Sequence, residues 1–329
     1  MRRSALGAGQ EFDILRRILA VQRTSTADGR IMVGPGDDCA VVRAGSLAVS
    51  VDLAIEGVHF RRAWLGARAI GYRSATAALS DLAAMAAQPV GVLAAVAVPA
   101  REMQLAEEIA AGVDEAAASC GAFVLGGDLS DSPGPLVIDV VALGEVDAPL
   151  LRAGARVGDE VWVTGVLGGA AAAVAAWRAG MKPTSEAERA FIRPTARTAE
   201  ARWLAEHCEL HAGIDLSDGL AGDAGHIAAA SDVAIVLDLR HVPVHAAASA
   251  YDPEQALALA LGGGDDYELC ITAAAGSIGT SAAAFERTFG IPVTRVGVVE
   301  EGAGVHAREQ GVRRPLPVGG FSHFRERGP

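Results

Sequence analysis

The sequence is poor in aromatic residues, in basic residues relative to acidic ones, and in cysteine. Aromatics make up 5% of the 329 residues, but the hydrophobic share of 51%, much of it alanine, excludes a mainly disordered chain. The 28 Lys and Arg residues against 40 Asp and Glu residues give a net charge of −12, which argues against general nucleic-acid binding. The cysteines form no C-x-x-C pair, so we expect reduced thiols in a cytoplasmic protein. They are Cys39, Cys120, Cys208 and Cys270.

Long uninterrupted hydrophobic runs are also missing. The most apolar stretch, residues 75–99, is broken by Asp81 and Pro89, and the basic pair Arg2-Arg3 is not followed by the apolar region of a signal peptide. We therefore expect a soluble, cytoplasmic protein that has neither a membrane nor a nucleic acid as a partner.

Strand-like and helix-like segments alternate along the whole chain. This alternation and the length predict an α/β protein, of α+β type, with two domains: residues 1–147 and residues 148–329. The predicted helices cover residues 11–22, 67–87, 102–119, 169–179 and 198–206, with a further helix opening at Ser217-Asp218. The predicted strands cover residues 31–33, 39–42, 47–53, 91–98, 122–125, 136–143, 161–164, 233–239, 267–272 and 293–299.

Aspartates beside or close to glycine or serine recur along the chain, and most of them follow a short apolar run, so that they fall where a predicted strand ends. They are Asp37, Asp38, Asp52, Asp81, Asp128, Asp215, Asp218, Asp265 and Asp266. Any one of them alone is typical of a turn or a helix N-cap, as we expect for Asp223. If several carboxylates converge, their repulsion requires cations, and Mg²⁺ combines carboxylate ligands with nucleotide phosphates. The recurrence predicts a site for magnesium and a polyphosphate.

Two local patterns sharpen this expectation. The pair Gly126-Gly127, after an apolar strand, would offer backbone N–H groups to a phosphate, although an ordinary strand-ending turn has the same sequence. Asp215 and Asp218 are three residues apart, so in a first helical turn both carboxylates could face one metal cluster.

Several basic residues could have either a binding role or a structural one. Arg152 could clamp a phosphate or be a solvated surface residue. His59, beside Phe60, could be packed in the core or could contact a phosphate near Asp52. His207 and His211 have the i,i+4 spacing of zinc ligands, but without the glutamate of H-E-x-x-H the zinc interpretation is the weaker one.

Several segments, taken in order, resemble the thiamine-monophosphate kinase family, within the aminoimidazole ribonucleotide synthetase-like superfamily. They include GPGDDCAVV, VSVDLAIEGVHF, LGGDLSDS, IDLSDGLAGDAGHIAAAS and GGGDDYELC, and the resemblance extends from about Glu11 to Phe324. It implies a two-domain α/β subunit whose N-terminal strands form a barrel-like core in a homodimer. It also implies direct, in-line transfer of the ATP γ-phosphate to thiamine monophosphate, assisted by several Mg²⁺ ions, giving thiamine diphosphate.

The resemblance assigns roles to individual positions. The metal-binding positions are Asp38, Ser50, Asp52, Asp81, Asp128, Asp215 and Asp218, of which Asp52 and Asp218 act in catalysis by positioning metal. The ATP positions are Gly127, Asp128, Arg152 and Ser217. The positions near thiamine monophosphate are His59, Asp265 and Phe321.

The chain departs from the family pattern at four places. Val51 stands where the family usually has Thr, Asp265 where it usually has Glu, and Leu129 where it usually has Thr. Ser119-Cys120 replaces a frequently aromatic stretch, which leaves the residue that stacks on adenine open. Val51, Asp265 and Leu129 motivate an alternative, a nucleotide-binding regulatory dimer without catalytic activity. A second alternative is another ATP-using synthetase of the superfamily.

Overall fold

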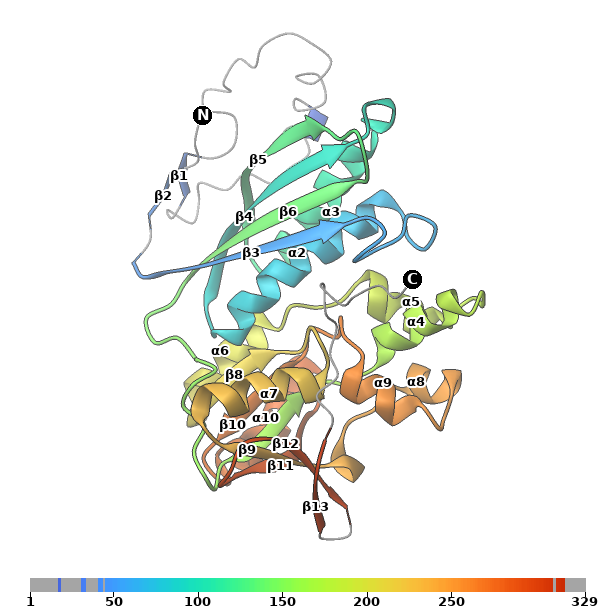
Figure 1. The fold of residues 1–329 in the computed structure, drawn as a ribbon. Coiled ribbons are helices and arrows are strands. Elements are labelled where there is room, and N and C mark those ends of the chain that lie inside the picture. Colours follow the sequence, from blue (N-terminus) through green and yellow to red (C-terminus); the bar gives the residue numbers. More distant parts are fainter. Residues whose placement is uncertain (1–16, 19–30, 34–40, 44, 310–311, 317–329) are drawn as a thin grey trace. The chain divides into compact units, whose positions relative to one another are not determined.

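The structure is a computed structural model that describes residues 17–18, 31–33, 41–43, 45–309 and 312–316. It divides into two compact units. The N-terminal unit comprises residues 1–82 and 87–149, and the C-terminal unit comprises residues 83–86 and 150–329. Figure 1 shows the elements of both units. Among the described residues, no helix has the length and apolar character needed to cross a membrane.

The N-terminal unit is built on a four-stranded sheet with the strand order β3-β6-β4-β5. The strands are β3 (Leu47–Ile55), β4 (Gln88–Val98), β5 (Phe123–Asp131) and β6 (Val137–Glu145). Neighbouring strands are antiparallel except for the parallel pair β4 and β5. A separate two-stranded sheet joins β1 (Ile31–Val33) to β2 (Val41–Val42).

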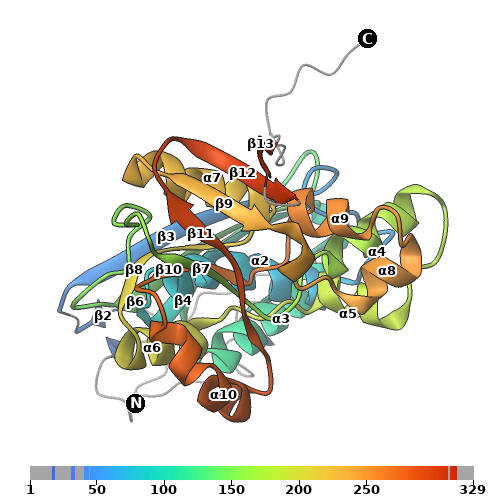
Figure 2. The same ribbon diagram turned by 90° about the horizontal axis from the view of Figure 1, so that it is seen from below.

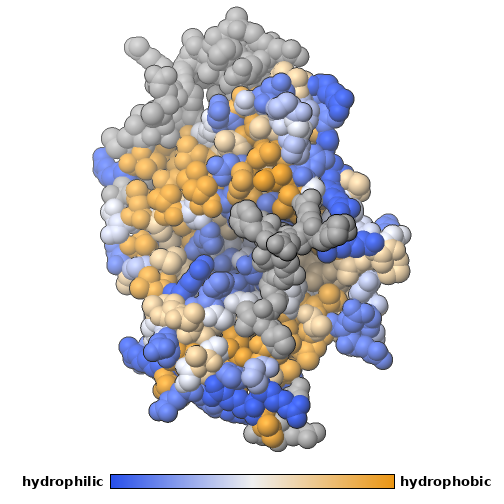
Figure 3. Space-filling view, viewed as in Figure 1, coloured by the Kyte–Doolittle hydropathy of each residue, from blue (hydrophilic) through white to orange (hydrophobic). Residues whose placement is uncertain are grey.

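Two helices, α2 (Ala67–Ala84) and α3 (Leu105–Ser119), lie on one face of this sheet, and a short 3₁₀ helix, η1 (Ala100–Glu102), precedes α3 (Figure 1). The helices cross at glycines, because a Cβ at Gly71 would overlap the Ile109 carbonyl and one at Gly112 would overlap the Arg68 carbonyl. On the opposite face, β3 exposes apolar side chains at every second position (Figure 3). These are Leu47, Val49, Val51 and Leu53.

The C-terminal unit contains a seven-stranded sheet with the order β13-β12-β9-β11-β7-β10-β8. Its strands are β7 (Glu160–Thr164), β8 (Leu210–Asp215), β9 (Ala234–Asp238), β10 (Leu269–Ala273), β11 (Val293–Glu300), β12 (Gly304–Glu309) and β13 (Val312–Pro315). The β9–β12 pair is parallel and the other pairs are antiparallel. The sheet is therefore mixed and is not a doubly wound parallel sheet.

The C-terminal unit has helices on both faces of this sheet and a further group of helices that pack on one another. The helices are α4 (Gly169–Arg178), α5 (Ser185–Ile192), α6 (Thr198–His207), α7 (Leu220–Ser231), α8 (Ala246–Tyr251), α9 (Ala256–Gly262) and α10 (Ser277–Phe289), with the 3₁₀ helix η2 (Leu239–His241). Of these, α4, α5, α8 and α9 form the further group. Figure 2 shows α7 on one side of the sheet and α6 and α10 on the other. The alternation of β-strand side chains explains both cores: Val161 and Val163 pack in the α7 core, and Trp162 between them packs in the core of α6 and α10.

Three local predictions are wrong. β3 continues to Ile55, so Asp52 lies inside a strand, because the ladder with β6 extends to the pair Ile55 and Val137. β5 continues through Gly126, Gly127 and Asp128, which pair with β4, so these residues do not form a strand-ending turn. The helix predicted from Ser217-Asp218 begins only at Leu220. The helix predicted over residues 11–22 falls almost wholly outside the described residues.

Candidate functional site

In the N-terminal unit, the sheet and α2 bring two of the predicted metal positions together. The hydroxyl of Ser50, on β3, donates a hydrogen bond to Oδ2 of Asp81, on α2. Asp52 is two residues further along β3, so its side chain projects from the same face of the strand as that of Ser50. Hard oxygen donors from two elements thus lie on the helix-covered side of the sheet, and this donor type suits Mg²⁺.

Gly127 and Asp128 occupy strand β5, where glycine has a steric reason. Gly127 pairs with Ala94 in the parallel ladder, and a Cβ at Gly127 would overlap the Ala94 carbonyl oxygen. Asp128, the next residue, is exposed. The close approach of the two strand backbones therefore explains why residue 127 is a glycine. That Gly127 also binds a nucleotide phosphate stays a prediction.

The imidazole of His59 has one nitrogen occupied by the backbone. Nδ1 accepts a hydrogen bond from the N–H of Ile55 at 3.0 Å, which closes the turn after β3. In the neutral ring the proton therefore resides on Nε2, and this nitrogen is a donor. An N–H donor suits a phosphate oxygen, so the tautomer is compatible with the predicted substrate contact.

In the C-terminal unit, a carboxylate cluster lies between β8 and α7. Asp215 is the last residue of β8 and is buried, and Asp218 lies in the turn that follows. Oδ2 of the buried Asp223 accepts hydrogen bonds from the N–H groups of Asp218 and Gly219, at 3.1 and 3.0 Å. Asp223 therefore has a structural role, as predicted, but it caps the turn from within the first turn of α7, whose N-cap residue is Gly219, and it orders the turn that carries Asp218.

The same carboxylates repel one another. Desolvation by burial, which is the largest cause, and the charges of Asp215 and Asp218 together raise the pKa of Asp223 to about 8. Ligand atoms of Asp218, Asp223 and His226 lie within 4.8 Å of one another. A divalent cation would offset this repulsion, so the cluster fits the predicted magnesium site by its charge and its oxygen donors.

The turn that carries Asp265 is bonded to the loop that carries Asp218. Asp265 donates its N–H to the Ser217 carbonyl at 2.9 Å, and Tyr267 donates to the Leu216 carbonyl at 2.8 Å. A Cβ at Gly264 would overlap the Ser217 carbonyl, so only glycine permits this approach. The structure thus places the predicted substrate residue Asp265 beside the predicted ATP residue Ser217.

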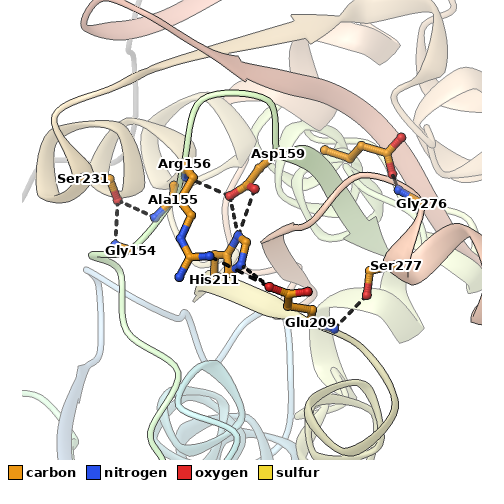
Figure 4. A network of polar contacts seen from close by, with 10 residues as sticks. Gly154, Ala155, Arg156, Asp159, Glu209, His211, Ser231, Gly276 and Ser277 are labelled. Atoms are coloured by element: carbon orange, nitrogen blue, oxygen red, sulfur yellow. Dashed lines mark hydrogen bonds and ion pairs between the residues drawn. The ribbon is translucent and has the colours of Figure 1, made fainter.

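A polar network holds the segment from Gly154 to Asp159, which follows Arg152 (Figure 4). Ser231 Oγ donates to the Arg152 carbonyl and accepts from the N–H groups of Gly154 and Ala155, each at 3.1 Å. Further along, the Asp159 carboxylate contacts His211 Nδ1 at 2.9 Å. The Arg152 side chain is exposed at the start of a segment that is fixed by these contacts.

The zinc interpretation of His207 and His211 is wrong for these two residues. His207 lies at the end of α6, where its ring stacks on Trp203 and its Nδ1 contacts the Trp203 carbonyl at 2.8 Å. His211 lies on β8, and its two nitrogens contact Asp159 and Glu209. Because a strand replaces the helix after residue 207, the i,i+4 spacing does not place the rings on one helical face.

Some predicted residues cannot be placed. Asp38, Cys39 and Phe321 lie outside the described residues. The other three cysteines, Cys120, Cys208 and Cys270, are free thiols, and Cys270 is buried.

The sequence analysis missed the contact between Arg197 and Glu268. No local motif indicates it, because the two residues are 71 positions apart in the chain.

Two family descriptions match most of the chain. Residues 36–146 match the N-terminal domain of AIR synthase related proteins, and residues 156–309 match the C-terminal domain of the same proteins. These ranges cover most of the described strands of both units.

Thiamine-monophosphate kinases from two organisms are similar to the chain over most of its length. The chain is 34% identical over 294 residues to the thiamine-monophosphate kinase of Rhodopirellula baltica, with 85% of this chain and 87% of the relative covered. It is 31% identical over 324 residues to the thiamine-monophosphate kinase of Escherichia coli K12, with 95% and 98% covered.

Solved structures have the same fold. The thiamine-monophosphate kinase of Stenotrophomonas maltophilia superposes with a TM-score of 0.80 at 34% identity, covering 91% of this chain and 96% of that one. AaThiL complexed with AMPPCP and TMP superposes with a TM-score of 0.74 at 28% identity, covering 95% of each chain. The hydrogenase maturation protein HypE of E. coli reaches 0.75 at 19% identity, covering 94% and 99%, and shows the fold alone.

Proposed function

Because the chain belongs to the thiamine-monophosphate kinase family, we propose that it transfers the γ-phosphate of ATP to thiamine monophosphate and releases thiamine diphosphate and ADP. The observation that carries the proposal is the bond between the Asp265 N–H and the Ser217 carbonyl. It joins the loop predicted to hold metal and ATP to the turn predicted to contact the thiamine moiety. The neighbour bound to AMPPCP, a methylene analogue of ATP, and to TMP supports the same pair of substrates.

Magnesium is part of the proposal. The ligands proposed within the described residues are Ser50, Asp52, Asp81, Asp128, Asp215 and Asp218, and Asp38 is proposed on the resemblance alone. When bound, the ions would neutralise the charge on the transferring phosphoryl group and align it, which is most of what this chemistry requires. The raised pKa of Asp223 supports a cation at Asp215 and Asp218.

The remaining residues have binding roles in the proposal. Gly127, Arg152 and Ser217 bind ATP, and the acceptor is bound by His59, Asp265 and Phe321. The Nε2–H of His59 donates to a phosphate oxygen, and the Asp265 carboxylate contacts the cationic substrate. No side chain is required as a strong base, because the attacking phosphate oxygen is already largely ionised near pH 7.

A homodimer formed through the N-terminal sheet is also proposed. Val49 and Val51 on β3 are 59% and 61% exposed, and Figure 3 shows apolar atoms gathered over this sheet. An edge strand with an apolar face of this kind is a surface that proteins normally cover. A second copy would cover it and give the barrel-like core implied by the resemblance. Sedimentation of the wild type and of Val49→Lys tests this: the wild type should be a dimer and the variant a monomer.

The direct test of function is chromatography of the products from purified protein, Mg-ATP and thiamine monophosphate. The expected result is the multiple-turnover appearance of thiamine diphosphate and ADP in equal amounts, abolished by EDTA and restored by added Mg²⁺. ADP without thiamine diphosphate would identify another phosphoryl acceptor. Measured ATP binding without ADP would favour the regulatory dimer and overturn the proposal.

A further inference from the structure

The turn at residues 265–267 has an unfavourable backbone conformation. Asp265 has φ +69° and Tyr267 has φ +51°, so two non-glycine residues in this short turn adopt the left-handed region. Aspartate tolerates that region better than most residues, but tyrosine does not. Such conformations persist only where surrounding contacts over-determine them, and they cluster at functional sites.

Contacts on both sides of the turn fix its side chains. Tyr267 donates its hydroxyl to Oδ1 of Asp265 at 3.0 Å, so the residue with the strained backbone also orients the carboxylate. Both oxygens of Asp266 accept from the Gly168 N–H, just before α4, at 3.0 and 2.9 Å. Leu216 donates its N–H to the Glu268 carbonyl at 2.7 Å, which ties the end of the turn to the loop after β8.

Glu268 directly follows this turn, and its side chain forms a buried ion pair with Arg197. Its carboxylate accepts from Arg197 Nε at 2.8 Å and from Nη2 at 2.5 Å, and from the Thr164 hydroxyl at 2.6 Å. The side chains of Arg197 and Glu268 are only 15% and 6% exposed. A Cβ at Gly165 would overlap the Glu268 carboxylate, so the backbone is shaped around the carboxylate.

Buried ion pairs are weak contributors to stability, since apolar replacements of similar volume are often as stable. A bidentate arginine instead fixes geometry, because its planar donors match a carboxylate in one orientation. Thr164 adds to this, since its hydroxyl also accepts the Leu269 N–H at 2.9 Å, where β10 begins. The network therefore fixes the position and direction of the chain as it leaves the strained turn.

We propose that the Arg197–Glu268 ion pair is a positioning device for the acceptor substrate, which holds the 265–267 turn so that Asp265 is presented beside Ser217. Neither Arg197 nor Glu268 is proposed to touch substrate. The proposal rests on the proposed function, since it gives Asp265 a substrate to contact.

The test compares Arg197→Lys with Arg202→Lys. The first keeps the charge but loses the two-pronged contact, whereas Arg202, on helix α6, which begins directly after Arg197, contacts Glu206 at the surface at 3.9 Å. For Arg197→Lys we expect the KM for thiamine monophosphate to rise about tenfold, the scale of losing a charged hydrogen bond. The KM for ATP and all parameters of Arg202→Lys should stay near wild type.

Amide hydrogen exchange over residues 262–270 is the second readout, and it does not depend on turnover. The N–H groups of Asp265 and Tyr267 are hydrogen-bonded in the native turn, so Arg197→Lys should accelerate their exchange and Arg202→Lys should not. If the wild type makes no thiamine diphosphate, the proposed function fails, whereas the exchange result still decides whether the ion pair holds the turn.

Two results would overturn the proposal: unchanged exchange and KM in folded Arg197→Lys, or an equal rise of both KM values with a general loss of thermal stability. If Arg197→Lys does not fold, Thr164→Val provides the same test. It removes a donor to Glu268 and the acceptor of the Leu269 N–H at nearly constant side-chain volume, so the readouts are the KM for thiamine monophosphate and the exchange of Asp265 and Tyr267, which should change in the same direction, by less. Wild-type values for Thr164→Val would then count against the proposal.

Discussion

The hydroxyl of Ser50 donates a hydrogen bond to the carboxylate of Asp81 and so joins strand β3 to helix α2. Ser50 is therefore suited to orienting Asp81, a proposed metal ligand, as well as to the metal-binding role proposed for Ser50 itself. Hydrogen bonds that orient metal ligands affect metal affinity more than they affect the fold.

Ser50→Ala should raise the Mg²⁺ concentration needed for half-maximal activity by about tenfold, because Asp81 loses the donor that orients it. The turnover number at saturating Mg²⁺ should change little. The measurement is a magnesium titration of thiamine diphosphate formation, with Ser50→Thr as the control that keeps a hydroxyl. A wild-type titration curve for Ser50→Ala would show that the bond has no part in metal binding.

Asp218→Asn should lower turnover by about a hundredfold or more, because an amide is a poor substitute for a carboxylate beside Mg²⁺. Asp52→Asn should behave in the same way. Asp223→Asn should stay within about threefold of wild type, since the amide oxygen can still accept from Asp218 and Gly219 and since Asn and Asp are comparable caps.

Steady-state rates of the three variants, with circular dichroism to verify folding, separate metal binding from capping. Turnover like that of wild type in Asp52→Asn or Asp218→Asn would remove that residue from the metal assignment. Turnover in Asp223→Asn as low as in Asp218→Asn would make Asp223 a metal ligand instead of a cap.

Residue patterns predicted the strands and helices that have a clear periodicity. They predicted the first and last residues of these elements less well. The helix over residues 67–87 is confirmed as α2, and the strand over 47–53 is confirmed within β3. The end of β3 was missed because partner strand β6, which the local sequence does not describe, sustains the ladder. Helix α7 begins late because Gly219, with φ +105°, stands outside the helical region.

The sequence allowed motifs to be recognised, but it did not predict the contacts that individual side chains make. Val51 stands beside Asp52 where the family usually has the hydroxyl of Thr. The alternation of side chains along β3 places the Val51 side chain on the exposed face, opposite to those of Ser50 and Asp52. Glu268 lies inside a recognised segment, yet its partner Arg197 is set by tertiary packing. Pairings between distant segments of this kind follow from the fold and not from local pattern.

Asp265 is proposed to contact the cationic acceptor, and two substitutions test its charge and its length separately. Asp265→Asn keeps a residue that tolerates φ +69° and removes the charge, so it should raise the KM for thiamine monophosphate about tenfold. Asp265→Glu should alter the KM for thiamine monophosphate more than that for ATP, because the carboxylate moves by one methylene and leaves the Tyr267 hydroxyl.

Initial-rate kinetics with each substrate varied in turn provide both constants. Tyr267→Phe is the matched control for orientation, since it removes only the hydroxyl that holds Asp265. If the effect of Asp265→Asn were confined to the KM for ATP, Asp265 would belong to the nucleotide subsite.

We expect His245 to make the stability of the C-terminal unit sensitive to acid. Its Nδ1 accepts the Ala247 N–H at 3.0 Å and so caps helix α8, a bond that exists only while that nitrogen carries no proton. Burial lowers the pKa of His245, and the charge of Glu186 opposes this shift in part. Since the folded-state pKa lies below the unfolded value of about 6.5, the unfolded chain binds a proton first as the pH falls.

The contribution of His245 is therefore present above pH about 6.5 and is lost as the pH falls through the folded-state pKa, by about 1 kcal/mol, the scale of a cap. Calorimetric melting of the wild type and of His245→Asn between neutral and mildly acidic pH measures this. Asparagine caps without titrating, so the variant should lose less stability on acidification than the wild type. His241→Asn, at an exposed position in η2, should follow the wild type, and identical pH profiles for all three proteins would show that the cap does not titrate.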